Sequence, residues 1–220
     1  MASHPSVAVI GLGTFGASVA GDLADYGHHV IGIDVDEKRV NTVAEAIPQA
    51  VIADARDEAA LRDAGVDQCE VAVVAIGENL EANLLCSMNL RLLEVPSIWV
   101  KSRSRTHRRI LSKIGVKHIV NPEMEMGRQV AQRIHNPFVG DYMSAGRGRT
   151  VVSFEAPKGL VGRRVAELRL PDKHEIEFLG LLRGSTLVRP EEDPSLEAED
   201  TLLLVGRRAA LQRFGEAHCR

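Results

Sequence analysis

Three glycines near the N-terminus have the spacing of a phosphate-binding turn. Gly11, Gly13 and Gly16 follow a short apolar run and precede a helical one, with Thr14 and Phe15 inside the turn. In a G-x-G-x-x-G turn the first glycine permits a tight turn and the second lets the backbone approach phosphate. The third lets the following helix pack on the sheet. Because the helix N-terminus also favours an anion, the pattern predicts a nucleotide or dinucleotide site.

Carboxylates end the second and third predicted strands. Asp34 ends the second strand, where a carboxylate accepts hydrogen bonds from ribose hydroxyls and repels a 2′-phosphate, which argues against NADP. Capping of the next helix is the alternative role for Asp34 and for Asp36. Asp54 ends the third strand and suits the adenine end of a ligand, although an N-cap of the following helix would equally explain it.

Cations and polar groups follow the fourth and fifth predicted strands. Gly77 allows the backbone to approach a ligand, whereas Glu78 or Asn79 could simply cap the next helix. Lys101 and Arg103 end the fifth strand, where positive charge would face phosphates. The alternative is that both side chains lie along the surface and pair with solvent.

Two further polar residues have open roles. His107 could contact phosphate or fill a helix surface, and no adjacent carboxylate prepares it as a base. Glu123 and Glu125 could hold a hard cation near the polyphosphate end. Carboxylates in the first turn of a helix also favour its dipole without any ligand, and the residue types alone favour that alternative.

The elements that position these residues alternate regularly. Short β-branched runs predict strands at 7–10, 30–34, 50–53, 71–76, 97–100 and 118–120, and helices are expected between them at 14–25, 37–46, 57–64, 79–93 and 105–114. This alternation predicts an α/β fold with a doubly wound parallel Rossmann sheet, whose ligand crevice lies between the first and fourth strands. The predicted buried face of the fourth helix consists of Leu80, Leu84, Leu85, Met88 and Leu92.

The pattern changes after a helix expected at 122–136. Residues 138–149 have the composition of a linker, and a small α+β C-terminal domain follows at 150–220. Its expected elements are strands at about 150–155, 177–182, 187–188 and 201–205 and a helix at 207–217. The nucleotide-binding domain is therefore expected to span 1–137.

Composition excludes several classes of protein. The chain has 220 residues, an apolar fraction of 45% and a formal net charge of −3, with no apolar run long enough to span a bilayer. The first residues lack the features of a signal peptide, and three widely spaced cysteines without a C-x-x-C pair predict a reducing cytoplasm. Seven cations and no acid occur between Lys101 and Lys117, whereas the acidic stretch at 191–200 is expected to be a solvated loop.

Several motifs together resemble one family. They are the run Val7 to Gly16, Val74 to Gly77, Ile98 to Lys101, Leu111 to Gly115, and Pro122-Glu123 followed by Met126-Gly127. With these motifs the whole chain resembles the RCK-domain (TrkA-N/TrkA-C) regulatory subunits of Ktr/Trk potassium uptake systems, closest to the KtrA type. The C-terminal part resembles the TrkA-C module in length and in its closing strand–helix step at 203–207.

The resemblance implies a nucleotide-sensing protein and not an enzyme. Such subunits bind ATP or ADP, and NAD or NADH in Trk-type relatives, and form homodimers that assemble into rings, typically octamers. The ring lies on the cytoplasmic face of the membrane and gates an integral potassium-translocating subunit of the KtrB or TrkH type. No nucleic acid partner is expected. By position, the nucleotide contacts of the family fall on Thr14, Asp34, Val35, Asp36, Asp54, Ala55, Ile76, Gly77, Glu78, Lys101, Ser102, Arg103 and His107.

The resemblance also assigns a cation site and shows two departures. The acidic residue that the family places at the dimer interface, with Mg²⁺, Ca²⁺ or Na⁺, falls on Glu123. Thr14 stands where the KtrA pattern has an arginine that reaches the terminal phosphate, so discrimination of ATP from ADP would fall to Lys101 or Arg103. Some relatives bind cyclic di-AMP in the second domain, but no contact set can be matched over 161–174.

Two other classes of protein fit the sequence less well. An NAD-dependent dehydrogenase would need a positioned acid–base group, and the C-terminal part offers only His174 beside Glu175. A redox-sensing transcription regulator would need a separate DNA-reading head, whereas the basic stretch here lies inside the nucleotide fold. A ligand sensor therefore remains the expected function.

Overall fold

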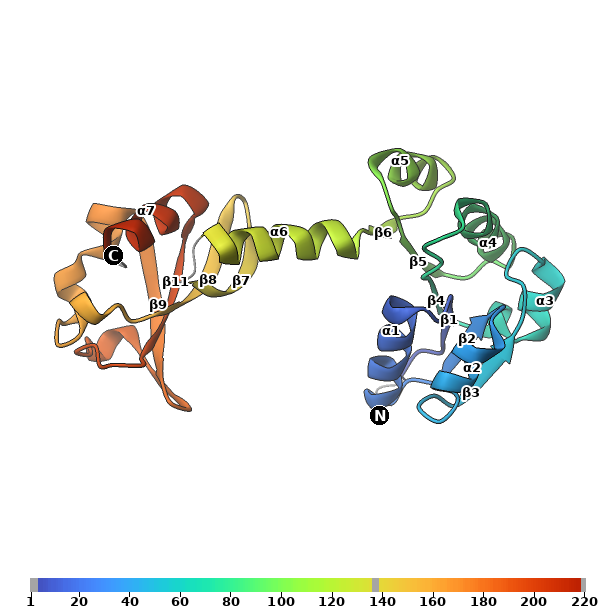
Figure 1. The fold of residues 1–220 in the computed structure, drawn as a ribbon, viewed down its shortest axis with the longest axis horizontal. Coiled ribbons are helices and arrows are strands. Elements are labelled where there is room, and N and C mark those ends of the chain that lie inside the picture. Colours follow the sequence, from blue (N-terminus) through green and yellow to red (C-terminus); the bar gives the residue numbers. More distant parts are fainter. Residues whose placement is uncertain (1–3, 136–138, 219–220) are drawn as a thin grey trace. The chain divides into compact units, whose positions relative to one another are not determined.

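The computed structural model describes residues 4–135 and 139–218. The chain divides into two compact units, Met1–Met124 and Glu125–Arg220, and each has a sheet and an apolar core of its own (Figure 1). Helix α6 (Pro122–His135) begins in the first unit and continues into the second. The unit border therefore falls before residue 137, where the sequence predicted it. The side chains described from Glu125 to Ile134 are exposed and add nothing to the N-terminal core.

The N-terminal unit contains a six-stranded sheet in the order β3-β2-β1-β4-β5-β6. Every neighbouring pair is parallel, and Val7 is in register with both Val30 and Val71. The strand order reverses between β1 and β4, which confirms the doubly wound α/β prediction. The strands are β1 (Val7–Ile10), β2 (Val30–Asp34), β3 (Gln49–Ile52), β4 (Val71–Val74), β5 (Ser97–Lys101) and β6 (His118–Val120).

Helices cover both faces of this sheet because its strands are apolar on both sides. Alternate residues of β1 belong to two different cores: Val7 and Val9 pack with α1 and α2, whereas Ala8 and Ile10 pack with α3, α4 and α5. The helices are α1 (Thr14–Asp25), α2 (Glu37–Val43), α3 (Glu58–Asp63), α4 (Leu80–Leu92) and α5 (Arg105–Lys113), with a short 3₁₀ turn η1 at Val66–Gln68. Side chains of Asp36, Asp57, Asn79 and Ser104 cap α2 to α5.

The buried face of α4 differs from the predicted one. Leu80, Met88 and Leu92 are 48%, 47% and 65% exposed, and Leu84 and Leu85 are only partly buried. The residues that α4 buries are Asn83, Cys86, Ser87 and Leu90. Asn83 and Ser87 are tolerated there because their polar atoms are hydrogen-bonded, so apolar spacing alone selected the wrong side of the helix.

The C-terminal unit has an antiparallel sheet in the order β10-β9-β11-β8-β7, closed by helix α7 (Arg208–His218). Its core includes Phe154, Leu181, Leu204 and Phe214, which confirms the α+β prediction. The strands are β7 (Val139–Gly146), β8 (Arg149–Glu155), β9 (Ile176–Arg183), β10 (Thr186–Val188) and β11 (Thr201–Arg207). Short helical turns lie at η2 (Lys158–Leu160), η3 (Val165–Leu168), η4 (Leu170–His174) and η5 (Pro190–Glu192).

The predicted linker at 138–149 is wrong for the part that the structure describes. Residue 138 lies outside the described residues, and Val139–Gly146 forms β7, which pairs with β8 as a hairpin. The glycines that suggested a linker make the hairpin turn, because Gly146 and Gly148 have φ of +76° and +74° on either side of Arg147.

Candidate nucleotide site

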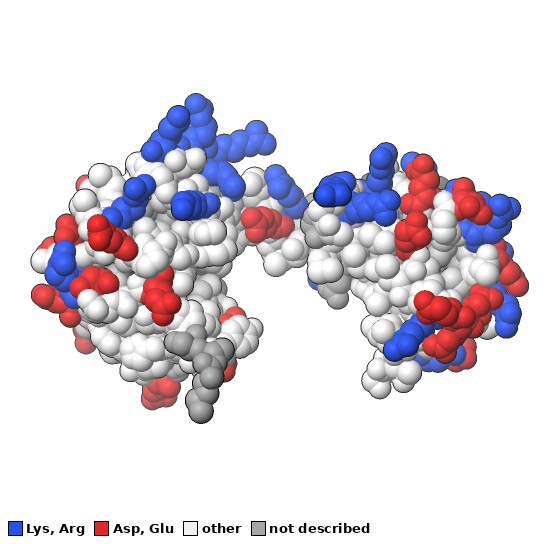
Figure 2. All heavy atoms as spheres, turned by 180° about the vertical axis from the view of Figure 1, so that it is seen from behind, with Lys and Arg blue, Asp and Glu red and all other residues white. Residues whose placement is uncertain are grey.

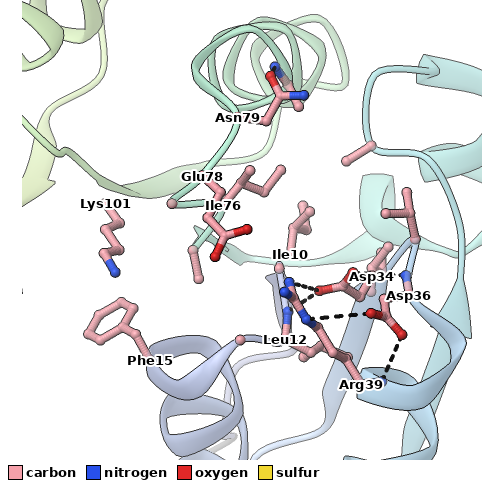
Figure 3. A pocket seen from close by; sticks show the side chains of 18 of the residues that line it. Ile10, Leu12, Phe15, Asp34, Asp36, Arg39, Ile76, Glu78, Asn79 and Lys101 are labelled. Carbon is pink, nitrogen blue, oxygen red and sulfur yellow. Dashed lines mark hydrogen bonds and ion pairs between the residues drawn. The ribbon is translucent and has the colours of Figure 1, made fainter.

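A cleft of about 900 Å³ opens at the carboxyl ends of β1, β2 and β4, where the strand order reverses (Figure 3). Fourteen of the predicted site residues line it: Gly11, Gly13, Thr14, Phe15, Asp34, Val35, Asp36, Asp54, Ala55, Ile76, Gly77, Glu78, Lys101 and Glu123. Gly16, Ser102, Arg103 and His107 do not line it. Sequence reasoning missed Arg39, Thr42 and Arg56 among the lining residues.

The glycine turn forms the floor of the cleft. Gly11 has φ of +95°, and a Cβ there would lie 2.8 Å from the backbone nitrogen of Ile76. A Cβ on Gly16 would collide with the carbonyl oxygen of Gly11, so this glycine lets α1 pack against the turn. Around Gly13, no described atom lies within 4 Å of a Cβ position, and no described side chain caps α1 there. The first N–H groups of α1 are therefore available to an anion.

Asp34 connects the end of β2 to this turn. Its side chain is buried, and its two oxygens accept hydrogen bonds from the backbone N–H groups of Leu12, at 2.7 Å, and Asp36, at 2.9 Å. Arg39 Nη1 lies 3.7 Å from the same carboxylate. Each carboxylate oxygen retains a lone pair, so Asp34 can still accept from ribose hydroxyls. The capping role belongs to Asp36, which accepts from the N–H of Lys38 at 2.8 Å.

Asp54 is held by a neighbouring arginine. Arg56 donates to both of its oxygens, with Nη2 2.6 Å from Oδ2, and this pairing lowers the pKa of Asp54. The cap of α3 is Asp57, so the alternative role predicted for Asp54 is wrong. The carboxylate end of the cleft thus carries two arginines, Arg39 and Arg56, that the sequence did not suggest.

Lys101 lies at the opposite end of the cleft. Among the described residues that line the cleft, it is the only Lys or Arg at this end. The Lys101 side chain is only 12% exposed, its Nζ lies 2.6 Å from Glu123 Oε1, and it stands 5.5 Å from the centre of the Phe15 ring. Figure 3 shows Lys101 and Phe15 together, across the cleft from Asp34 and Arg39. The hydrogen bond from Lys101 lowers the pKa of Glu123.

Glu123 was also predicted to bind a cation. In the described part of the chain, no three His, Cys, Asp or Glu side chains converge as metal ligands. A cation on Glu123 would therefore need other ligands, such as phosphate oxygens, waters or groups from a second copy.

His107 is a buried structural residue. It is 3% exposed, and its Nε2 lies 3.0 Å from Asn83 Oδ1. The Asn83 amide donates to the carbonyls of Ile76, at 2.8 Å, and Lys101, at 3.1 Å, which joins the ends of β4 and β5 beside the cleft. Because the N–H of Arg103 points at His107 Nδ1, 3.3 Å away, Nδ1 accepts and Nε2 donates to Asn83. Burial, and then the charge of Arg103, lower the pKa of His107.

The remaining predicted residues support this edge of the sheet. Ser102 is fully buried and donates through Oγ to the carbonyl of Val120. Arg103 is exposed, with Nη1 3.4 Å from the carbonyl of Glu78. Asn79 caps α4, and Glu78 faces the cleft. Sequence reasoning also missed Asn83. Its signal was the presence of two polar residues one turn apart on a helix, Asn83 and Ser87, and the Ser87 hydroxyl donates to the Asn83 carbonyl.

Comparison with known proteins follows the same division of the chain. Residues 7–122 match the TrkA-N domain, and residues 150–217 match the TrkA-C domain. The chain belongs to the TrkA-N/TrkA-C family. This TrkA-N/TrkA-C protein is 36% identical to Ktr system potassium uptake protein C of Bacillus subtilis over 94% of each chain. It is 33% identical, over the same shares, to Ktr system potassium uptake protein A of that bacterium, and 32% identical to protein A of Vibrio alginolyticus over 90% of this chain and 91% of that protein.

Solved structures share the fold. The GsuK channel matches this TrkA-N/TrkA-C protein with a TM-score of 0.68 at 13% identity, covering all of this chain and 40% of that one. The GsuK RCK domain gives 0.65 at 12% identity, over all of this chain and 48% of that one. The protein thus spans less than half of either GsuK chain. Within its described residues, no helix is both long and apolar enough to cross a membrane.

Proposed function

We propose that this protein is the nucleotide-sensing regulatory subunit of a potassium uptake system and that ATP or ADP binds in its cleft. The observation that carries the proposal is the placement of two kinds of polar group at the two ends of one cleft. A buried carboxylate, Asp34, lies beside the glycine turn at one end, and a nearly buried cation, Lys101, lies at the other. An adenine nucleotide has matching groups, with ribose hydroxyls at one end and phosphates at the other.

The glycine turn sets the direction of the ligand. Ribose hydroxyls would bond to Asp34, and the phosphates would lie over the turn against the N-terminus of α1. Lys101 would then take the distal phosphate, with Glu123 next to it as a ligand for Mg²⁺, Ca²⁺ or Na⁺. The potassium uptake relatives support the biological role, and solved relatives described as bound to NAD, ADP or AMP support the ligand class.

The cleft suits sensing better than catalysis. Among the described lining residues, none is a histidine, and the acids that line the cleft are paired with arginine or lysine, or lie open to solvent. His174, the acid–base candidate of the C-terminal unit, packs against the rings of Phe214 and His218. A sensor needs only that the ligand binds two conformations with different affinity.

Two exposed apolar ridges support self-association. On α4, Leu80, Leu84, Met88 and Leu92 recur every four residues, and three of them are about half exposed or more. On α6, Met126, Val130 and Ile134 recur in the same way and are 56%, 47% and 76% exposed. Residues four apart share one helix face, so each ridge offers a self-complementary contact.

Two different self-complementary contacts on one chain can build a closed ring when their two-fold axes meet at one centre. One contact makes homodimers and the other joins dimers, which supports a ring such as an octamer. We place this ring at the cytoplasmic face of the membrane, bound to an integral potassium-translocating subunit, on the strength of the Ktr relatives.

Calorimetric titration with ATP, ADP, NAD, NADH and cyclic di-AMP tests the ligand. We expect an adenine nucleotide to bind and Asp34→Ala to weaken it roughly ten- to a hundredfold, because hydrogen bonds to a charged group are lost. Asp63→Ala, at an exposed position on the end of α3, is the control and should bind normally. Failure of every nucleotide to bind, or substrate-dependent reduction of NAD, would overturn the proposal.

A further inference from the structure

The outer side of α5 is a concentrated cationic surface. Arg105, Arg108, Arg109 and Lys113 on α5, and Lys117 in the turn that follows the helix, are all exposed. We call these five residues the basic face. Figure 2 shows Lys and Arg side chains gathered at the top of the N-terminal unit, over α5. The inner side of α5 is anchored in the core by His107 and Leu111, so the helix cannot turn this face inward.

The charges of the basic face are not neutralised within the described chain. No acidic residue occurs between Glu94 and Glu123, and none of the five side chains has a carboxylate at ion-pair distance in the described part of the molecule. Arg108 donates to a backbone carbonyl, that of Ile119. By contrast, the cations of the cleft are paired, as Arg39, Arg56 and Lys101 show. The proposed nucleotide site therefore leaves these five charges without a role.

We propose that the basic face of α5 docks on the anionic phospholipid headgroups of a membrane. Four long cationic side chains on one helix and a fifth in the turn after it, with Ile110 37% exposed among them, suit a broad anionic surface, because such a surface requires no fixed spacing of the charges. A strand of nucleic acid would instead be expected to find aromatic side chains for its bases, and the described α5 residues include no Phe, Tyr or Trp. The proposal goes beyond nucleotide sensing and does not depend on it.

Vesicle co-sedimentation of the full chain tests the proposal. Vesicles of phosphatidylcholine alone are compared with vesicles that also contain phosphatidylglycerol, at low and at high salt. We expect binding only to the anionic vesicles and release by salt, because this attraction is screened within a Debye length. Each basic residue near such a surface contributes roughly a factor of five, so Arg105→Glu/Arg109→Glu/Lys113→Glu should lower partitioning by far more than about tenfold.

A matched control variant distinguishes loss of the basic face from the change in the net charge of the protein. Lys158→Glu/Arg207→Glu/Arg208→Glu changes the charge equally at exposed positions of the C-terminal unit and should still bind. The neutral variant Arg105→Gln/Arg109→Gln/Lys113→Gln should fall between the wild type and the charge-reversed variant, which covers the case in which reversal disturbs folding. ADP titration of each variant reports on the nucleotide site separately.

Three results would overturn the proposal. They are the absence of binding to anionic vesicles, equal loss in the control variant, and displacement of the vesicles by duplex DNA through the same three residues. The last result would assign the face to nucleic acid.

Discussion

Lys101 Nζ and Glu123 Oε1 lie 2.6 Å apart, which joins the end of β5 to the first turn of α6 at the rim of the cleft. The lysine side chain is 12% exposed and the glutamate 64%, so the carboxylate is the partner that lies open to solvent. A phosphate that enters the cleft would compete with Glu123 for the same cation. Occupancy of the cleft would then be communicated directly to the start of α6.

Replacing Lys101 tests its role at the distal phosphate. In Lys101→Ala we expect ATP affinity to fall roughly ten- to a hundredfold and ADP affinity to change less, because a charge-assisted hydrogen bond is lost only by the longer ligand. Calorimetry with both nucleotides measures the ratio. Arg62→Ala, on the exposed side of α3, is the control. An equal loss for ATP and ADP would contradict the assignment of Lys101 to the distal phosphate.

Glu123→Gln removes the carboxylate that competes with phosphate for Lys101 and keeps the shape of the side chain. With divalent cations chelated, we expect this variant to bind ATP several-fold more tightly than the wild type, since the neutral amide holds Lys101 less strongly. If Glu123 also holds a cation, added Mg²⁺ should strengthen ATP binding to the wild type and not to the variant. Calorimetry in both conditions is the measurement, and equal weakening with and without Mg²⁺ would refute both roles.

Asn83 should be essential for the shape of the cleft. Asn83→Leu leaves the partly buried carbonyls of Ile76 and Lys101 without their donor, which costs up to about 1–3 kcal/mol for each group. Urea unfolding should report this loss, and ADP binding should weaken because both carbonyls border the cleft. Asn79→Ala, which removes an exposed helix cap, should cost only about 1 kcal/mol. Equal stability of the two variants would show that the Asn83 bonds contribute little.

The success and failure of the sequence predictions have the same physical origin. The six parallel strands were predictable because a sheet covered on both faces requires continuous apolar runs such as Val7–Ile10. Asp34 was predictable because its distance from the glycine turn follows from the length of one β-α-β step. Local patterns of this kind depend on residues close together in the chain.

Long-range pairs were not predictable. His107 was expected at the ligand and is buried. Its partner Asn83 lies 24 residues earlier, and no local pattern links the two residues. The pairing of Lys101 with Glu123 also depends on tertiary structure. The β7–β8 hairpin was taken for a linker because glycine and serine are common in both.

The buried His107 predicts a dependence of stability on pH. Its pKa is lowered in the folded protein, so the stabilisation is complete above the ordinary value of about 6.5 and declines as the pH falls below it, because the unfolded chain binds the proton first. One such group changes the free energy of unfolding by at most about 1.4 kcal/mol per pH unit. Urea unfolding of the wild type and of His107→Gln across this range should show a shallower decline in the variant.

Two other histidines require a control in that experiment. Burial also lowers the pKa of His174 and of His218, which act in the same direction in the C-terminal unit. His174→Gln should therefore remove only the contribution of His174 to the pH dependence of the free energy of unfolding. The contribution of His107 should remain. If the free energy of unfolding depends on pH identically in the wild type and in His107→Gln, the pKa of His107 does not differ between the folded and unfolded states.

The two apolar ridges predict distinct products when either is disrupted. Met88→Lys places a charge in the centre of the α4 ridge, and Val130→Lys does the same on α6. If the ridges make the two different contacts of a ring, each variant should stop at a dimer held by the intact ridge, and the double variant should be a monomer. Light scattering after gel filtration measures the masses, and Asn41→Lys at an exposed position on α2 should leave the assembly unchanged. A wild-type monomer, or a full assembly in the double variant, would show that the ridges are not the interfaces.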